Sequence, residues 1–449
     1  MSTPTVLPAS ALARLTLAGT PPAGRYAAAA LSRAALYLLP LLLAPAATAA
    51  LARLPWQLPA AALVTGWCAM TVLAARGRVV AGRSGSARSA RQVLAGFLVV
   101  AAGWSASLAL INAAPAWLPA GLHELAADPV TGYAVTGSVL ALAAAVATGA
   151  ATGMEPMVLR WSLPLAVVAV AIASGRLSEL GQLHPSLGQL PAALLLPAGI
   201  AVPLLRMGLL AWDPRRRHRN AQPADDPAWA ERFDRADLRT SACYLAFGAA
   251  QAGLVVTAWQ LTRPAVADGG LPPSVVPLLL TLPVVQLWLG WHVHRVTVGP
   301  GRTDRAAHQR YVHRVAWGTL GALLPALVAG VALLAAAPRL PYGLSHHPDP
   351  PGLVHALATG VLLAGLMALG SLLAARARPG LAALVVGAPL LATPALTAGP
   401  LVSGALLAAL PAALAAAYAL GLVVAANLLF DPAPAPAAPA PGSPAEAAR

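Results

Sequence analysis

Long apolar segments alternate with short polar segments along the whole chain. A helix that crosses a membrane needs about 20 mostly apolar residues, and twelve segments are long enough. Most are apolar on every side, so their periodicity does not show which face packs inward. The pattern predicts an all-α integral membrane protein with about twelve transmembrane helices in two six-helix halves, at approximately 27–51, 57–75, 92–114, 130–152, 157–175, 190–212, 241–262, 273–293, 315–337, 353–375, 379–398 and 401–430.

The positive charges of the loops predict how these helices are oriented. Cytoplasmic loops of membrane proteins carry an excess of basic residues. The arginines concentrate in alternate loops, at 76–91, 213–240, 295–314 and 376–378. The loops of the other side carry only Arg53, Arg176, Arg263 and Arg339. We therefore predict a multi-pass protein of a bacterial inner (plasma) membrane, with both termini in the cytoplasm.

This orientation predicts the result of reporter fusions. A reporter that is active only outside the cytoplasm should give no signal after Asp213 and a strong signal after Asp349, because the two loops are predicted on opposite sides. Reporter activity in intact cells, divided by the amount of fusion protein, measures both positions. The reverse pattern at both positions would overturn the orientation.

The composition excludes several other classes of protein. Hydrophobic residues make up 58% of the chain and charged residues 10%, with a mean hydropathy of +0.70, whereas soluble domains carry about 25% charged residues. This excludes an ordinary soluble enzyme, a disordered protein and a nucleic-acid-binding domain. The net charge of +14 fits loops that contact anionic lipid. Cys68 and Cys243 lie in apolar segments and define neither a disulfide framework nor a zinc site.

Two similar halves flank a polar middle segment. The loops at 76–91 and 295–314 are both rich in glycine and arginine and hold equivalent places in the halves. Repeated halves are the usual plan of secondary transporters. We predict a cytoplasmic N-terminal segment (1–26), a first six-helix half (27–212), a cytoplasmic middle loop (213–240), a second six-helix half (241–430) and a disordered Pro/Ala-rich tail (431–449).

Polar residues inside the spans mark candidate binding sites. No Asp or Glu lies in the middle of a span, which argues against a proton- or sodium-coupled cation exporter. The candidate cargo-binding residues are Arg33, Arg206, Gln286 and His292, with the arginines facing an anionic group. Alternatively, the arginines snorkel to lipid headgroups and Gln286 hydrogen-bonds a neighbouring helix. His292 and His294 are two residues apart on a helix, so they point to different faces and cannot chelate one ion.

Enzyme signatures are absent from the sequence. It contains no HExxH, GxSxG or CxxC motif and no P-loop, and we predict no catalytic residue, cofactor or metal. A membrane-embedded enzyme that acts on a lipid or isoprenoid substrate is one alternative. A non-catalytic membrane scaffold that recruits partners through 213–240 is another.

Parts of this sequence resemble two families of transporters. The segment 80–85 resembles the major facilitator loop motif GxLADRxGRR, which latches a gate in that family. Arg83 and Gly85 match the motif, whereas Gly82 stands at the aspartate position. The six-plus-six halves, the prolines of the first helix, the long middle loop and the basic polar residues resemble the multidrug/oligosaccharidyl-lipid/polysaccharide flippase group. This second resemblance implies a transporter or flippase-like protein that moves an amphipathic or anionic cargo, such as a lipid-linked molecule, by alternating access.

Overall fold

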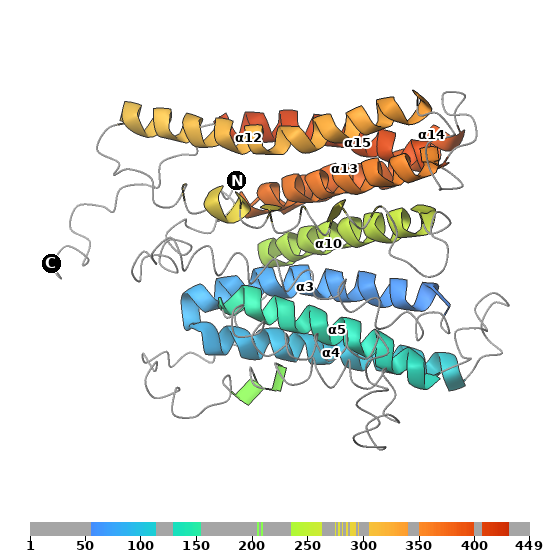
Figure 1. Ribbon diagram of the computed structural model, residues 1–449. Helices are drawn as coiled ribbons and strands as arrows, with labels where there is room; N and C mark the ends of the chain where they lie inside the picture. Colours follow the sequence, from blue (N-terminus) through green and yellow to red (C-terminus); the bar gives the residue numbers. More distant parts are fainter. Residues whose placement is uncertain are drawn as a thin grey trace, which may run out of the picture.

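The computed structural model describes most of the predicted helices (Figure 1). The described residues are 55–113, 129–153, 235–262, 305–339, 350–398 and 406–430, with short pieces within 204–209 and 274–295. The predicted first and fifth spans lie outside these residues, and the sixth and eighth are described only in pieces. Within the described part, seven helices are long and apolar enough to cross a membrane.

Three helices of the first half form one bundle: α3 (Gln57–Ser84), α4 (Ser86–Ala113) and α5 (Pro129–Thr152). α5 packs against both of the others and is the most buried of the three. Its alanines lie against Val93 and Phe97 of α4. The outer side of α4 exposes Leu98, Val99 and Leu110, as expected of a face that contacts lipid tails.

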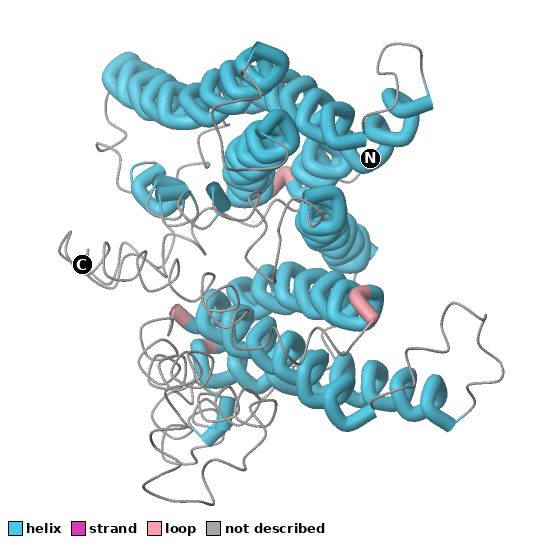
Figure 2. Tube along the Cα trace, turned by 45° about the vertical axis from the view of Figure 1, so that its right-hand side comes forward, coloured by secondary structure: helices cyan, strands magenta, loops and turns pink. Residues whose placement is uncertain are grey.

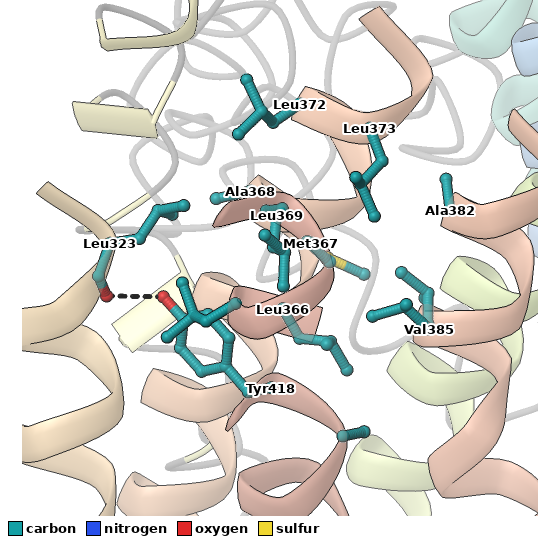
Figure 3. Packing of buried hydrophobic residues seen from close by; sticks show 14 of the residues in the cluster. Leu323, Leu366, Met367, Ala368, Leu369, Leu372, Leu373, Ala382, Val385 and Tyr418 are labelled. Carbon is teal, nitrogen blue, oxygen red and sulfur yellow. Dashed lines mark hydrogen bonds between the residues drawn. The ribbon is translucent and has the colours of Figure 1, made fainter. Parts of the chain in front are cut away.

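The second half contains five described helices. They are α10 (Arg235–Thr262), α12 (Arg305–Ala336, followed by the short 3₁₀ helix η4, Ala337–Arg339), α13 (Pro350–Ala375), α14 (Pro379–Ala398) and α15 (Leu406–Phe430). α13 contacts the other four and is the most buried of the described spans. Its leucines form the centre of the largest hydrophobic cluster among the described residues (Figure 3).

The two bundles meet along one pair of helices. α3 of the first half packs against α10 of the second, and the other extensive helix contacts among the described residues lie within one half. Figure 1 shows α10 between the α3–α5 group and the α12–α15 group, and Figure 2 shows the same division from another side. The contact between α3 and α10 therefore joins the halves in the described part of the chain.

Several helices extend beyond their predicted apolar segments. α3 continues to Ser84, although its predicted segment ended at 75. α12 begins at Arg305, although its predicted segment began at 315. Alanine, arginine and glutamine are good helix formers, so backbone hydrogen bonding continues where the hydropathy falls. The expectation of a loop at 76–91 is wrong, because only Gly85, with φ of +88°, separates α3 from α4. Glycine adopts this backbone conformation without a Cβ clash.

Candidate functional site

The structure places one of the four predicted cargo-binding residues. Arg33, Arg206 and Gln286 lie outside the described residues, so their roles stay predictions. His292 lies at the end of a described helical piece, and only 2% of its surface is exposed. The search for a site therefore begins at His292 and at the contact between the two halves.

A polar pair crosses the contact between the halves. The indole Nε1 of Trp67 on α3 donates a hydrogen bond of 3.1 Å to Oε1 of Gln251 on α10. Gln251 is 6% exposed, and Gln251 lies near the middle of its apolar span. A buried amide oxygen without a partner is costly, so this bond favours the state in which α3 and α10 touch.

The same contact depends on a close approach at Gly248. A Cβ atom at this position of α10 would collide with Oγ1 of Thr71 and lie 3.1 Å from Cα of Cys68, both on α3. The Thr71 hydroxyl lies 3.1 Å from the carbonyl oxygen of Tyr244 and can donate to it. Small residues allow such close helix packing in membranes. Gly248 therefore sets the distance between the halves at this level.

His292 is held by a residue of α12. Its Nδ1 lies 2.7 Å from Oγ1 of Thr319, which is fully buried. Trp288 stands one helical turn before His292, and the two ring centroids are 6.4 Å apart. Arg376, directly after α13, is the charged residue whose field reaches His292. The site thus draws on three elements that are far apart in the sequence.

The polar atoms of this site are incompletely satisfied. Nε1 of Trp288, Nε2 of His292 and Nε of Arg376 are all buried, with no hydrogen-bond partner among the described residues. Burial lowers the pKa of Arg376, yet a guanidinium stays charged at any physiological pH. Asp237, near the start of α10, is the only acidic residue in the described helices.

Sequence reasoning selected His292 as a candidate but did not select its neighbours. Arg376 was grouped with the loop arginines that determine topology, and nothing in the sequence distinguishes it from the exposed Arg378 two residues later. Trp288 was not considered, although its spacing of one turn from His292 puts both on one helix face. Thr319 lies in another helix, and only the tertiary structure pairs it with His292.

Sequence comparisons give no family for the chain. No family model matches it, and no curated protein matches it. Comparison with solved structures is more informative.

The fold is similar to that of solved transporters. A MOP superfamily transporter from Pyrococcus furiosus Vc1 has 14% identity and a TM-score of 0.55, with 90% of this chain and 94% of that chain covered. A MATE mutant has 14% identity and a TM-score of 0.53, with 90% of this chain and 95% of that chain covered. MATE in complex with MaL6 has 13% identity and a TM-score of 0.52, with 90% of this chain and 94% of that chain covered. At these identities the likeness establishes the fold alone.

The likeness confirms the predicted fold class. The chain is an all-α integral membrane protein with the fold of a polytopic secondary transporter, and that fold has twelve transmembrane helices. The predicted resemblance to the multidrug/oligosaccharidyl-lipid/polysaccharide flippase group agrees with a MOP superfamily neighbour. The match extends over nine-tenths of the chain, so it covers both halves and not one bundle.

Proposed function

We propose that the protein is a membrane transporter that moves an amphipathic or anionic cargo by alternating access. The observation that supports this most is the division into two helix bundles, with the fold of solved transporters, that meet at α3 and α10. A bundle that packs tightly within itself moves as a unit, and a narrow contact between two bundles suits rocking about a central site. The Trp67–Gln251 bond then breaks and re-forms in each cycle.

The charge of the spans supports an anionic cargo over a cationic one. Acidic residues are almost absent from the described helices, whereas Arg376, directly after α13, contributes a positive charge whose field reaches His292. The neighbour from Pyrococcus furiosus is described as having a binding pocket of reverse polarity, which suggests a different function for that transporter. A positive charge at a poorly hydrated site attracts anions strongly, because water screens charges poorly there.

Flux in proteoliposomes tests the proposal. Purified protein in vesicles should release trapped hexyl phosphate faster than empty vesicles do. Arg33→Ala and Arg206→Ala should each lower this flux about tenfold if the arginines face the cargo. Lys substitutions should restore part of it, since lysine keeps the charge but loses the planar fork of arginine. Membrane abundance of all four variants, measured alongside, separates a binding defect from a folding defect.

Each other outcome selects a different function. Full flux in both alanine variants would mean that Arg33 and Arg206 only contact headgroups. Chemical conversion of a lipid phosphate in detergent, with no flux in vesicles, would indicate a membrane-embedded enzyme. Partner proteins that bind 213–240 when neither activity is present would indicate a scaffold.

A further inference from the structure

Aromatic side chains join the arginine-rich end of α12 to two other elements. The ring centroid of Phe430, the last residue of α15, lies 5.2 Å from that of Trp317 and 5.5 Å from that of His313. The hydroxyl of Tyr311 donates a 2.9 Å hydrogen bond to the carbonyl oxygen of Arg295, at the end of the preceding helical piece. These contacts hold the first turns of α12 beside the ends of both neighbouring elements.

Trp317 marks the level at which lipid tails meet headgroups. Tryptophan is enriched at this boundary of a membrane, and Trp317 is 67% exposed. Its partner Phe430 is the last apolar residue of its span, because Asp431 follows directly in the sequence. From Trp317 to Val328 the helix rises about 16 Å, close to half of a hydrocarbon core of about 30 Å. The tails of one leaflet therefore fit along this part of α12.

One exposed face of α12 changes in character along its length. Arg314 and Arg310 are exposed about one and two turns before Trp317, and residues three, four or seven apart share a helix face. Beyond Trp317 the same face continues with the exposed apolar side chains of Leu324 and Val328. Figure 1 shows α12 at the outer edge of its bundle, beside α15. The order of basic, aromatic and apolar side chains matches that of a phospholipid from its headgroup to its tails.

Basic residues outnumber acidic residues at this end of the bundle. The segments 291–314 and 426–435 contain five arginines and two acidic residues, Asp304 and Asp431. The excess positive charge attracts lipids with a net negative charge, and guanidinium groups are well suited to bind phosphate oxygens. A zwitterionic lipid has no net charge and gains little from this attraction.

We propose that this face of α12 binds one phospholipid with a net negatively charged headgroup. The phosphate contacts Arg310 and Arg314. The tails lie along Trp317, Leu324 and Val328. This ligand comes from the membrane itself, so the site is separate from the proposed transport of a cargo.

Photocrosslinking in vesicles tests the proposal. The full chain is reconstituted in phosphatidylcholine vesicles with a trace of phosphatidylglycerol or phosphatidylcholine, each carrying the same diazirine-labelled tail. At an ionic strength of about 0.01 M, the phosphatidylglycerol probe should label 315–339 at least about tenfold more than the phosphatidylcholine probe. The preference should largely disappear at about 1 M, because the Debye length falls from about 30 Å to about 3 Å. Proteolysis and mass spectrometry quantify the labelled segment.

Two double variants that each remove two positive charges locate the site. Arg310→Gln with Arg314→Gln should reduce labelling by the phosphatidylglycerol probe to the level of the phosphatidylcholine probe. Arg339→Gln with Arg378→Gln, at exposed arginines at the far end of α12 and after α13, should leave it within about twofold. Chromatography in detergent checks that both variants are folded.

Three results would overturn the proposal. Equal labelling by the two probes at low ionic strength would show that α12 does not distinguish the headgroups. A preference that persists at high ionic strength would show that charge does not cause it. An equal loss in both double variants would indicate attraction by the whole protein surface. The first two results need only the unmodified protein, and none of the three depends on hexyl phosphate flux.

Discussion

Replacing Gly248 by leucine should separate the two halves at their contact and expose Cys68 to alkylation. In the structure a Cβ atom at Gly248 would collide with Thr71 and come within 3.1 Å of the Cα atom of Cys68. The backbone of α3 cannot yield as a side chain can, and overpacking of this kind costs about 1–3 kcal/mol. This cost favours the state in which α3 and α10 are apart.

The thiol of Cys68 reports this change without knowledge of the cargo. It is partly buried at the contact, 3.8 Å from the carbonyl oxygen of Leu245. In a Cys243→Ser background, maleimide should modify Cys68 about tenfold faster in Gly248→Leu than in the parent protein, since each 1.4 kcal/mol shifts a population tenfold. Hexyl phosphate flux should fall in parallel, because alternating access requires the halves to close again.

Three further variants serve as controls for the labelling of Cys68: a leucine at a glycine with open space around it, a smaller substitution at Gly248, and a second substitution at Thr71. Gly103→Leu on α4 has open space around its Cβ position and should not change the labelling rate. Gly248→Ala should raise the rate less than leucine does, and adding Thr71→Ala should bring it back toward the parent value by removing the colliding hydroxyl. An unchanged Cys68 labelling rate in a folded Gly248→Leu protein would show that α3 and α10 do not need this close approach.

The helices could be predicted from the sequence because hydropathy reports directly on the membrane. α14 begins at Pro379 and ends at Ala398, as predicted, and α5 begins at Pro129, one residue before its predicted start. Helix ends in arginine-rich segments were harder to predict, since hydropathy marks the extent of the membrane and not that of the helix. The backbone of α12 is helical from Arg305, although its first turns are polar.

The packing could not be predicted, because the central helices are apolar on every side. α13 shows no polar face, yet it is the helix that the rest of the second half surrounds. Its glycines at 360, 365 and 370 were a signal, because small residues mark close helix packing in membranes. The sequence does not say what they contact. The structure places backbone of Ser274 at Gly360, Tyr418 at Gly365, and Phe247 with Val386 at Gly370.

Most of the candidate site could not be predicted from the sequence, for a related reason. A polar residue in a span is visible in the sequence, and His292 was selected as a candidate in this way. Which of its ring nitrogens carries the proton depends on Thr319, which hydrogen-bonds both His292 and the carbonyl oxygen of Val315 on another helix. Likewise, Arg376 is partly buried whereas Arg378 is exposed, and burial is a tertiary property.

Gly365→Val should destabilise the second half more than a typical substitution does. A Cβ atom on Gly365 would lie 2.6 Å from Cζ and 2.7 Å from the hydroxyl oxygen of Tyr418. Tyr418 is fully buried, and its hydroxyl donates a 2.6 Å hydrogen bond to the carbonyl oxygen of Leu323 on α12 (Figure 3). To make room, the ring must move and lose this bond. Overpacking costs about 1–3 kcal/mol, and a hydrogen bond between membrane helices adds about 0.6 kcal/mol on average.

Thermal unfolding of the detergent-purified protein, followed by the loss of its monodisperse chromatographic peak, measures this effect. Tyr418→Phe removes only the hydrogen bond and should lower the midpoint slightly, whereas Gly365→Val should lower it by several degrees. Gly321→Ala, on α12 with open space at its Cβ position, should leave it unchanged. Gly365→Ala combined with Tyr418→Leu should be more stable than Gly365→Ala alone, because the shorter side chain removes the collision. If the double variant is no more stable than Gly365→Ala, the collision with Tyr418 is not the cause, and the closeness of α13 and α15 does not depend on this glycine.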